Sequence, residues 1–267
     1  MAALLRKWFA LISIYAQEGL AYRANGFIWI LTDTVPAMIM PLVFIASSKV
    51  SGEIGGYSNA QIVQYYLAML VITNFITCHL MWELALEIKE GVFTTSLLRP
   101  VSYFQVCAIR NFVWRVLRLM YFIPALIVLL FFYRRYLTGE PIYLGWETWI
   151  SIILGHLVSF SLAYMLTMLA LVFQETRSIF ELYYFPMLFL SGQMFPVYLM
   201  PDWIVTLAKA LPFYYTTALP LDIMLHHLEP SASIGPMLVQ AAWIAGHLIG
   251  ARILWGVGLK SYAAVGM

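Results

Sequence analysis

The sequence predicts an all-α integral membrane protein, with a single domain over residues 1–267 and six membrane-spanning helices. Of the 267 residues, 63% are hydrophobic and only 10% are charged, whereas a soluble domain carries roughly 25% charged residues. The mean hydropathy is +0.83. Apolar stretches of about 20 residues, the length that crosses a bilayer as a helix, recur along the chain. The net charge of +2 gives no indication of a nucleic-acid partner.

Residues 1–25 are expected to form an amphipathic helix that lies in the membrane interface rather than across the membrane. The polar side of this helix carries Arg6, Lys7, Gln17 and Glu18, and the apolar side carries Leu4, Trp8, Leu11, Ile12 and Tyr15. A signal peptide is the alternative interpretation. It is disfavoured because no small-residue cleavage site closes the apolar run before Gln17.

Six later segments have the length and apolar character of membrane spans. Their approximate bounds are Gly26–Ala46, Gln61–Trp82, Phe112–Tyr133, Trp149–Phe173, Leu182–Met200 and Pro236–Gly258. An even number of spans places both termini on the same side of the membrane.

The positive charges between the spans predict which side that is, because cytoplasmic loops carry an excess of Lys and Arg. Eight such residues fall on the side of the termini: Arg6, Lys7, Arg23, Lys89, Arg99, Arg110, Arg177 and Lys260. Four fall on the other side: Lys49, Arg134, Arg135 and Lys209. Arg115, Arg118 and Arg252 are placed near span ends that face the side of the termini. We therefore expect cytoplasmic termini.

The segment 83–100 is the longest run in this apolar chain that carries charges of both signs. Glu83, Glu87 and Glu90 are spaced so that they share one face of a helix. Gly91 is expected to end that helix in a left-handed cap, and Pro100 restarts the chain toward the third span. A short helix between two spans is well placed to meet a soluble partner; the alternative is a solvated loop helix with no partner.

The segment 195–221 is almost as apolar as a span, but prolines divide it at positions 196, 201, 212 and 220. No uninterrupted helix of 20 residues fits there, so we expect two short helices that re-enter the outer leaflet. The segment also carries rings suited to the interface, at Phe195, Trp203, Phe213 and Tyr215.

Two sets of motifs make the chain resemble a permease subunit of the ABC-2 type of ABC transporters. The first set is Glu87-Ile88-x-x-Gly91 followed by Leu97-Leu98-Arg99-Pro100-Val101-Ser102, after the second span. The second set is Ser191-Gly192-x-x-Phe195-Pro196, Pro201-x-Trp203 and Leu211-Pro212-Phe213-x-Tyr215, after the fifth span. Together with the amphipathic start and the six spans, these motifs extend the resemblance over nearly the whole chain.

The resemblance implies a permease subunit in a plasma membrane, the bacterial inner membrane, that pairs with a second permease, identical or homologous. It implies that segment 83–100 couples this subunit to separate ATPase subunits, which bind ATP and Mg, while this chain binds no cofactor. The coupling residues would be Glu83, Glu87, Glu90, Gly91, Leu98, Arg99 and Pro100. The expected activity is ATP-driven export of a lipophilic or amphiphilic substrate.

Asp33 and the neighbouring Thr32 are the candidate polar residues on a translocation path, because a carboxylate within a span is costly unless it faces protein or water. The alternative is a structural hydrogen bond from Thr32, Thr34 or a neighbouring helix. A proton-coupled secondary transporter that uses Asp33 is the rival function, and a membrane-embedded enzyme is a weaker one. We expect no catalytic residues and no metal site; His226, His227 and Glu229 are interpreted as loop residues.

Overall fold

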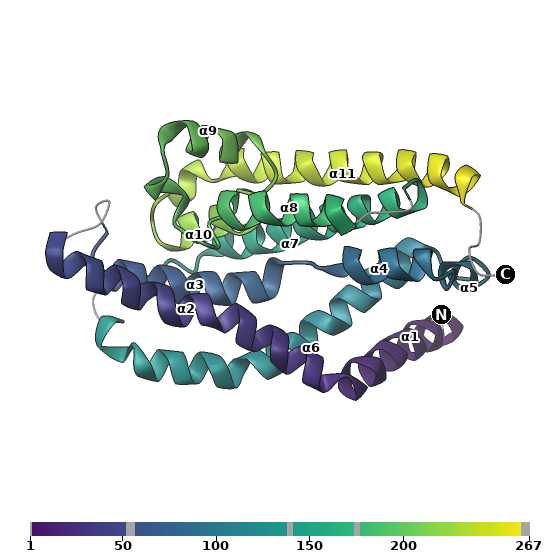
Figure 1. Ribbon diagram of the computed structural model, residues 1–267, viewed down its shortest axis with the longest axis horizontal. Coiled ribbons are helices and arrows are strands. Elements are labelled where there is room, and N and C mark those ends of the chain that lie inside the picture. The colour runs from purple at the N-terminus through teal and green to yellow at the C-terminus, as the bar shows by residue number, and fades with distance from the viewer. Residues whose placement is uncertain (1, 52–56, 138–140, 174–176, 263–267) are drawn as a thin grey trace.

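The computed structural model describes residues 2–51, 57–137, 141–173 and 177–262, and in these ranges the chain is all-helical with no strand (Figure 1). Met1, the first residue of the predicted interfacial helix, lies outside them. The α-helices are α1 (Ala2–Ala21), α2 (Arg23–Ser51), α3 (Asn59–Ile76), α4 (Leu80–Lys89), α5 (Phe93–Leu97), α6 (Tyr103–Phe132), α7 (Trp146–Met168), α8 (Arg177–Leu190), α9 (Asp202–Ala210), α10 (Ala218–Met224) and α11 (Ile234–Ser261). Four 3-10 turns lie between them: η1 (Arg134–Tyr136), η2 (Leu169–Leu171), η3 (Val197–Leu199) and η4 (Pro230–Ala232).

Five apolar helical stretches are long enough to cross a membrane: Gly26–Ser48, Asn59–Lys89, Tyr103–Phe132, Trp146–Leu171 and Pro230–Ser261. They correspond to the first, second, third, fourth and sixth predicted spans. The prediction is therefore confirmed for five spans. The second of them is not one continuous helix, because it is interrupted between α3 and α4.

The bounds predicted for the fifth span, Leu182–Met200, are wrong. The apolar helix α8 has 14 residues and ends at Leu190, and the chain then turns at Gly192, whose φ is 80°. Only glycine adopts this left-handed conformation without strain. The hydroxyl of Tyr65 on α3 donates to the Gly192 carbonyl at 2.7 Å, so the turn is held against the centre of the bundle.

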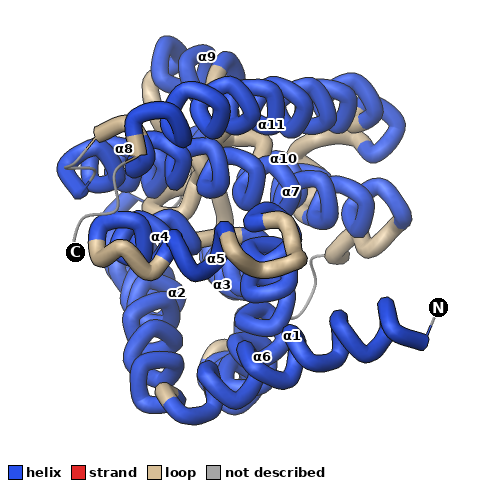
Figure 2. The backbone as a smooth tube through the Cα atoms, turned by 90° about the vertical axis from the view of Figure 1, so that its right-hand side faces the viewer, coloured by secondary structure: helices blue, strands red, loops and turns tan. Residues whose placement is uncertain are grey.

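The helices run along the long axis of the molecule, with α3 and α7 in the middle (Figures 1 and 2). Both ends of the chain lie at the same end of the bundle as α4 and α5, and α9 and α10 lie at the opposite end (Figure 1). Within the bundle, α2, α3 and α6 pack together, and α7 packs against α11, α10, α4 and α3.

Helix α1 has the expected amphipathic character, but it ends at Ala21 rather than near residue 25. Its apolar side packs on α6, where Leu11 and Tyr15 are buried with Val106, Val113 and Leu117. Its polar side includes Lys7, whose ammonium donates to the Pro100 carbonyl at 3.2 Å. The N-terminal helix is therefore attached to the chain just before α6 begins.

The segment 195–221 contains the two short helices that the sequence predicts, α9 and α10, although α10 continues to Met224. Pro196 and Pro201 precede η3 and α9 as their N-cap residues, positions where the missing backbone donor costs little. Trp203 on α9 is 68% exposed, whereas Tyr215 is buried and its hydroxyl donates to the Lys209 carbonyl at 2.9 Å. Phe195 and Phe213 are half-buried and Pro212 is buried.

Glycines allow α7 to approach its neighbours closely. A Cβ added at Gly155 would lie 2.3 Å from the Thr216 carbonyl oxygen, and one at Gly250 on α11 would lie 2.7 Å from the Met165 sulfur. Gly250 therefore allows α11 to pack closely on α7. Gly246 does not, because nothing lies within 4 Å of its added Cβ.

We predict that Gly155→Ala destabilises the protein by roughly 1–3 kcal/mol, the usual cost of forcing extra volume into a packed core. The matched control is Gly246→Ala, which should be neutral or slightly stabilising because alanine favours the helix and the space is open. The measurement is the thermal unfolding midpoint of the full chain in detergent. Equal midpoints for the two variants would contradict the close approach of α7 to Thr216.

Candidate functional site

The most unusual feature of the bundle is the interruption of the second span at Thr77, Cys78 and His79, between α3 and α4. Within an apolar bundle the freed carbonyls of such a break need hydrogen-bond donors. Arg115 on α6 supplies them: its guanidinium donates to the carbonyls of Asn74 and Thr77, both at 2.7 Å, and of Ile76 at 3.5 Å. A cation at this position also complements the negative end of the α3 dipole.

Side chains from α6 and α7 make further hydrogen bonds at the break. The His156 ring contacts the Ile76 carbonyl through Nδ1 at 3.2 Å and the Asn111 amide through Nε2 at 3.0 Å. The backbone N–H of Cys78 donates to the Ser159 hydroxyl at 2.9 Å. His156 therefore links α7 to α6 and to the end of α3.

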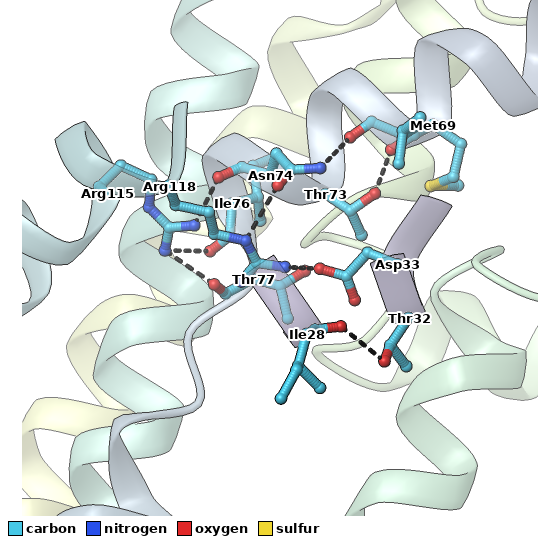
Figure 3. A network of polar contacts seen from close by, with 11 residues as sticks. Ile28, Thr32, Asp33, Met69, Thr73, Asn74, Ile76, Thr77, Arg115 and Arg118 are labelled. Atoms are coloured by element: carbon cyan, nitrogen blue, oxygen red, sulfur yellow. Dashed lines mark hydrogen bonds and ion pairs between the residues drawn. The ribbon is translucent and has the colours of Figure 1, made fainter. Parts of the chain in front are cut away.

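Asp33 belongs to the same network (Figure 3). Its carboxylate pairs with the Arg118 guanidinium, and Arg118 Nε donates to the Asn74 side-chain oxygen at 2.9 Å. The partner of Asp33 is thus on a neighbouring helix, and one arginine links α2, α3 and α6. Thr32 is outside this network, because its hydroxyl is exposed and donates to the Ile28 carbonyl of its own helix at 2.9 Å.

Arg110 forms a second charged cluster, closer to the end of the bundle where the termini lie. Its guanidinium is 3.2 Å from a Glu18 carboxylate oxygen and 3.3 Å from one of Glu83, and it also pairs with Glu87. These three carboxylates come from α1 and α4, while Arg110 comes from α6. The cluster joins three helices through one buried cation.

The sequence predicts that Glu83, Glu87 and Glu90 share one helix face, and the first two pair with Arg110. The Glu83 side chain is still 47% exposed, and Glu90, the C-cap residue of α4, is exposed as well. Arg110, Arg115 and Arg118 all lie within the 30-residue helix α6, so Arg110, which was expected between the spans, is part of a helix.

The chain forms an elbow between α4 and α5, and Gly91 makes the bend. Its φ is 75°, so the predicted left-handed end of the helix is confirmed. The fully buried Phe93 holds the elbow in place, since its ring lies 4.8 Å from that of Tyr103 on α6 and 5.8 Å from that of Trp255 on α11. Leu98, Arg99 and Pro100 follow α5 and are all exposed, Leu98 by 83%.

A separate polar group lies at the opposite end, around the buried carboxylate of Asp222. The Tyr214 hydroxyl donates to it at 2.6 Å, and His227 Nδ1 lies 3.5 Å from its other oxygen. Burial and then the negative charge of Asp222 raise the pKa of Tyr198 to about 12, and the same two causes raise the pKa of Tyr214 well above its ordinary value. Both hydroxyls therefore stay protonated at neutral pH and can donate.

Among the residues that the structure describes, no three His, Cys, Asp or Glu side chains are grouped in a way that could hold a metal ion. Both cysteines, Cys78 and Cys107, are buried free thiols. The candidate functional elements are therefore the break with its two arginines, the Arg110 cluster and the elbow.

Asp33→Asn is predicted to lower stability by roughly 1–3 kcal/mol, because it leaves the Arg118 cation without its counter-charge in the bundle. The double variant Asp33→Asn/Arg118→Gln should recover part of that loss, since it removes both charges. Asp202→Asn, at an exposed carboxylate on α9, serves as the control. Thermal unfolding midpoints of the full chain check this, and strictly additive losses in the double variant would contradict the pairing.

A comparison with known families complements this geometry. A family model described as an ABC-2 family transporter protein matches residues 34–266, which include the break, the elbow and the helices α9 and α10. Comparisons with curated proteins and with solved structures found no significant match. The match covers most of the chain, and the chain therefore belongs to the ABC-2 family of transporter proteins.

Proposed function

We propose that this chain is the permease subunit of an ATP-driven exporter, and that it works with a second permease subunit and separate ATPase subunits. The observation that carries the proposal is the elbow of α4, Gly91 and α5, in a chain of the ABC-2 family. The elbow lies at the same end of the bundle as both termini (Figure 1). ATP and Mg would be bound by the ATPase, and this chain would carry out no chemistry.

The elbow offers the ATPase an apolar surface rather than an acidic one. Leu86 on α4, Val92 at the bend and Leu98 after α5 are all exposed. In protein interfaces the buried centre of the contact is more apolar and poorer in charge than its rim. We therefore assign the docking contact to these three side chains, with Glu90 and Arg99 at its edge.

The elbow is also connected rigidly to the membrane helices. Arg110 attaches α4 to α1 and α6, and Phe93 attaches α5 to α6 and α11. A displacement of the elbow, when the ATPase subunits close on ATP, would move these helices with it as a shear or hinge motion. Transport would follow from that motion.

We propose a six-span topology in which α8 is the fifth span and both termini are cytoplasmic, in a plasma membrane of the bacterial inner-membrane type. Arg115 lies 17 residues before the last residue of α6, or about 25 Å along the helix axis. If the last residue of α6 lies at the outer boundary, Arg115 is inside the opposite boundary of a hydrocarbon core about 30 Å thick. Asp33 is held by an ion pair at a similar level, so we assign it a structural role and not that of a proton carrier.

The topology predicts the accessibility of engineered cysteines. With Cys78 and Cys107 replaced by alanine, a cysteine at Ser231 should react with an impermeant thiol reagent in intact cells. A cysteine at Thr95 on the elbow should react only after permeabilisation. Both positions are exposed in the structure, so burial would not explain a difference. Labelling of Thr95→Cys in intact cells would contradict cytoplasmic termini.

Docking at the elbow predicts that Leu98→Asp disrupts the complex with the ATPase, since a carboxylate replaces the most exposed apolar side chain of the elbow. The amount of ABC-type ATPase that co-purifies, and its ATP hydrolysis in lipid, should fall at least tenfold. Leu144→Asp, at a 56% exposed leucine before α7, is the matched control and should keep both. An unchanged complex in Leu98→Asp would exclude this docking surface, and the absence of any ATPase with the wild-type chain would refute the proposed function.

A further inference from the structure

A cavity of about 410 Å³ lies between α2, the break, the start of α4 and α6. Small-molecule sites in proteins have volumes of about 300–1,000 Å³, so this cavity is large enough for a small ligand or for the head group of a larger one. Two residues of its wall, Trp29 and Glu83, are exposed: Trp29 by 48%, and the Glu83 side chain by 47%. The cavity therefore communicates with the surface of the bundle.

The wall combines cationic and aromatic groups. Arg115 and Arg118 both line the cavity and both donate to Asn74, so their guanidinium groups lie close to each other (Figure 3). Indole rings line it as well, from Trp29 on α2, Trp82 on α4 and Trp114 on α6. Guanidinium groups recognise oxyanions, and the indole rings give the remainder of a ligand an apolar surface.

The balance of charge around the cavity favours an anion. Arg118 pairs with Asp33, and the lining carboxylate of Glu83 pairs with Arg110. Arg115 has backbone carbonyls as its hydrogen-bond partners, and within the described part of the chain it forms no ion pair with a carboxylate. A cation within a membrane domain is costly unless it is paired, so Arg115 is the group that an anionic ligand would neutralise.

Polar groups without hydrogen-bond partners in the wall of the cavity also favour an anionic ligand. Four lining residues each hold a buried polar atom without a hydrogen-bond partner in the described structure: the Trp114 indole N–H, the Arg115 Nε–H, the Tyr121 hydroxyl and the Thr77 hydroxyl. Most buried polar groups in proteins are paired. The first two atoms only donate, and both hydroxyls can donate, so a ligand rich in acceptor oxygens would satisfy them after small side-chain adjustments.

We propose that this cavity receives the anionic head group of an amphiphilic substrate, a phosphate or carboxylate attached to an apolar body. Arg115 and Arg118 bind the oxyanion, Trp114 and Tyr121 donate to it, and Trp29 and Trp82 contact the apolar body. This inference rests on the proposed transport function and names its substrate class. The break between α3 and α4 then forms one wall of the substrate site, next to the helix that leads to the elbow.

The test measures binding of dodecyl phosphate to the full chain in nanodiscs of zwitterionic lipid, with dodecyltrimethylammonium as the cationic probe of equal chain length. Dodecyl phosphate should bind at least tenfold more tightly. The variant Trp114→Phe/Tyr121→Phe keeps an aromatic ring at each position and removes both donors, so its affinity for dodecyl phosphate should fall about tenfold. Trp149→Phe, which removes an indole N–H that donates to the Leu144 carbonyl far from the cavity, should bind as the wild type does.

Arg115→Gln should lose dodecyl phosphate binding, but it also removes donors that hold the break and can impair folding. For this reason the variant Trp114→Phe/Tyr121→Phe, called the aromatic variant below, decides whether the proposal holds. Equal affinity for the anionic and cationic probes, or unchanged affinity in Trp114→Phe/Tyr121→Phe, would overturn the proposal. So would displacement of dodecyl phosphate by inorganic phosphate at equal concentration, which would indicate a site for a free anion.

Two further arms distinguish a transported substrate from a bilayer lipid and from failure of the transport proposal. Phosphatidylglycerol in the nanodisc should not block dodecyl phosphate; if it does, the occupant is a membrane lipid and the substrate assignment is overturned. In the complex with the ATPase, dodecyl phosphate should stimulate ATP hydrolysis by the wild type but not by the aromatic variant. Binding without stimulation would overturn only the substrate assignment, whereas the absence of any ATPase complex would refute the proposed function and leave the binding result intact.

Discussion

The architecture depends on one constraint: the backbone exposed by the break between α3 and α4 must be hydrogen-bonded inside an apolar bundle. Unpaired backbone groups in such surroundings each cost several kcal/mol, and Arg115 alone satisfies three carbonyls. The position of α6 relative to α3 follows from these bonds. His156 and Ser159 fix α7 at the same place, so the break organises the middle of the bundle instead of weakening it.

Hydropathy was sufficient to predict five of the apolar stretches and the helical character of the chain. The preference of glycine for a left-handed cap predicted the turn at Gly91, and the prolines predicted the short helices α9 and α10. Hydropathy could not reveal the break, because Thr77, Cys78 and His79 include no proline or glycine and the helix is ended by partners distant in sequence. The charge count likewise could not show that Arg110, Arg115 and Arg118 have partners on other helices. The bounds of the fifth span failed because the residues after Leu190 are apolar without being helical.

The Arg110 cluster shows that a correctly predicted helix face need not be a free surface for a partner. Glu83 and Glu87 do share a helix face, but both carboxylates pair with Arg110 within the bundle. Three carboxylates share one cation, so the group retains excess negative charge at the end of the bundle where the chain begins and ends. Because α1 contributes Glu18, the N-terminal helix is attached through Arg110 to α4, the first helix of the elbow.

The shortness of α8 has a consequence for the bilayer itself. Its 14 residues extend over about 21 Å, less than a hydrocarbon core of about 30 Å, whereas the 30 residues of α6 and the 28 residues of α11 are long enough to cross it. A short hydrophobic helix is accommodated by local thinning of the membrane or by adjustment of the flanking residues. With α8 as the proposed fifth span, lipids beside α8 would be compressed and those beside α11 would not, so the bilayer around the protein would have an uneven thickness.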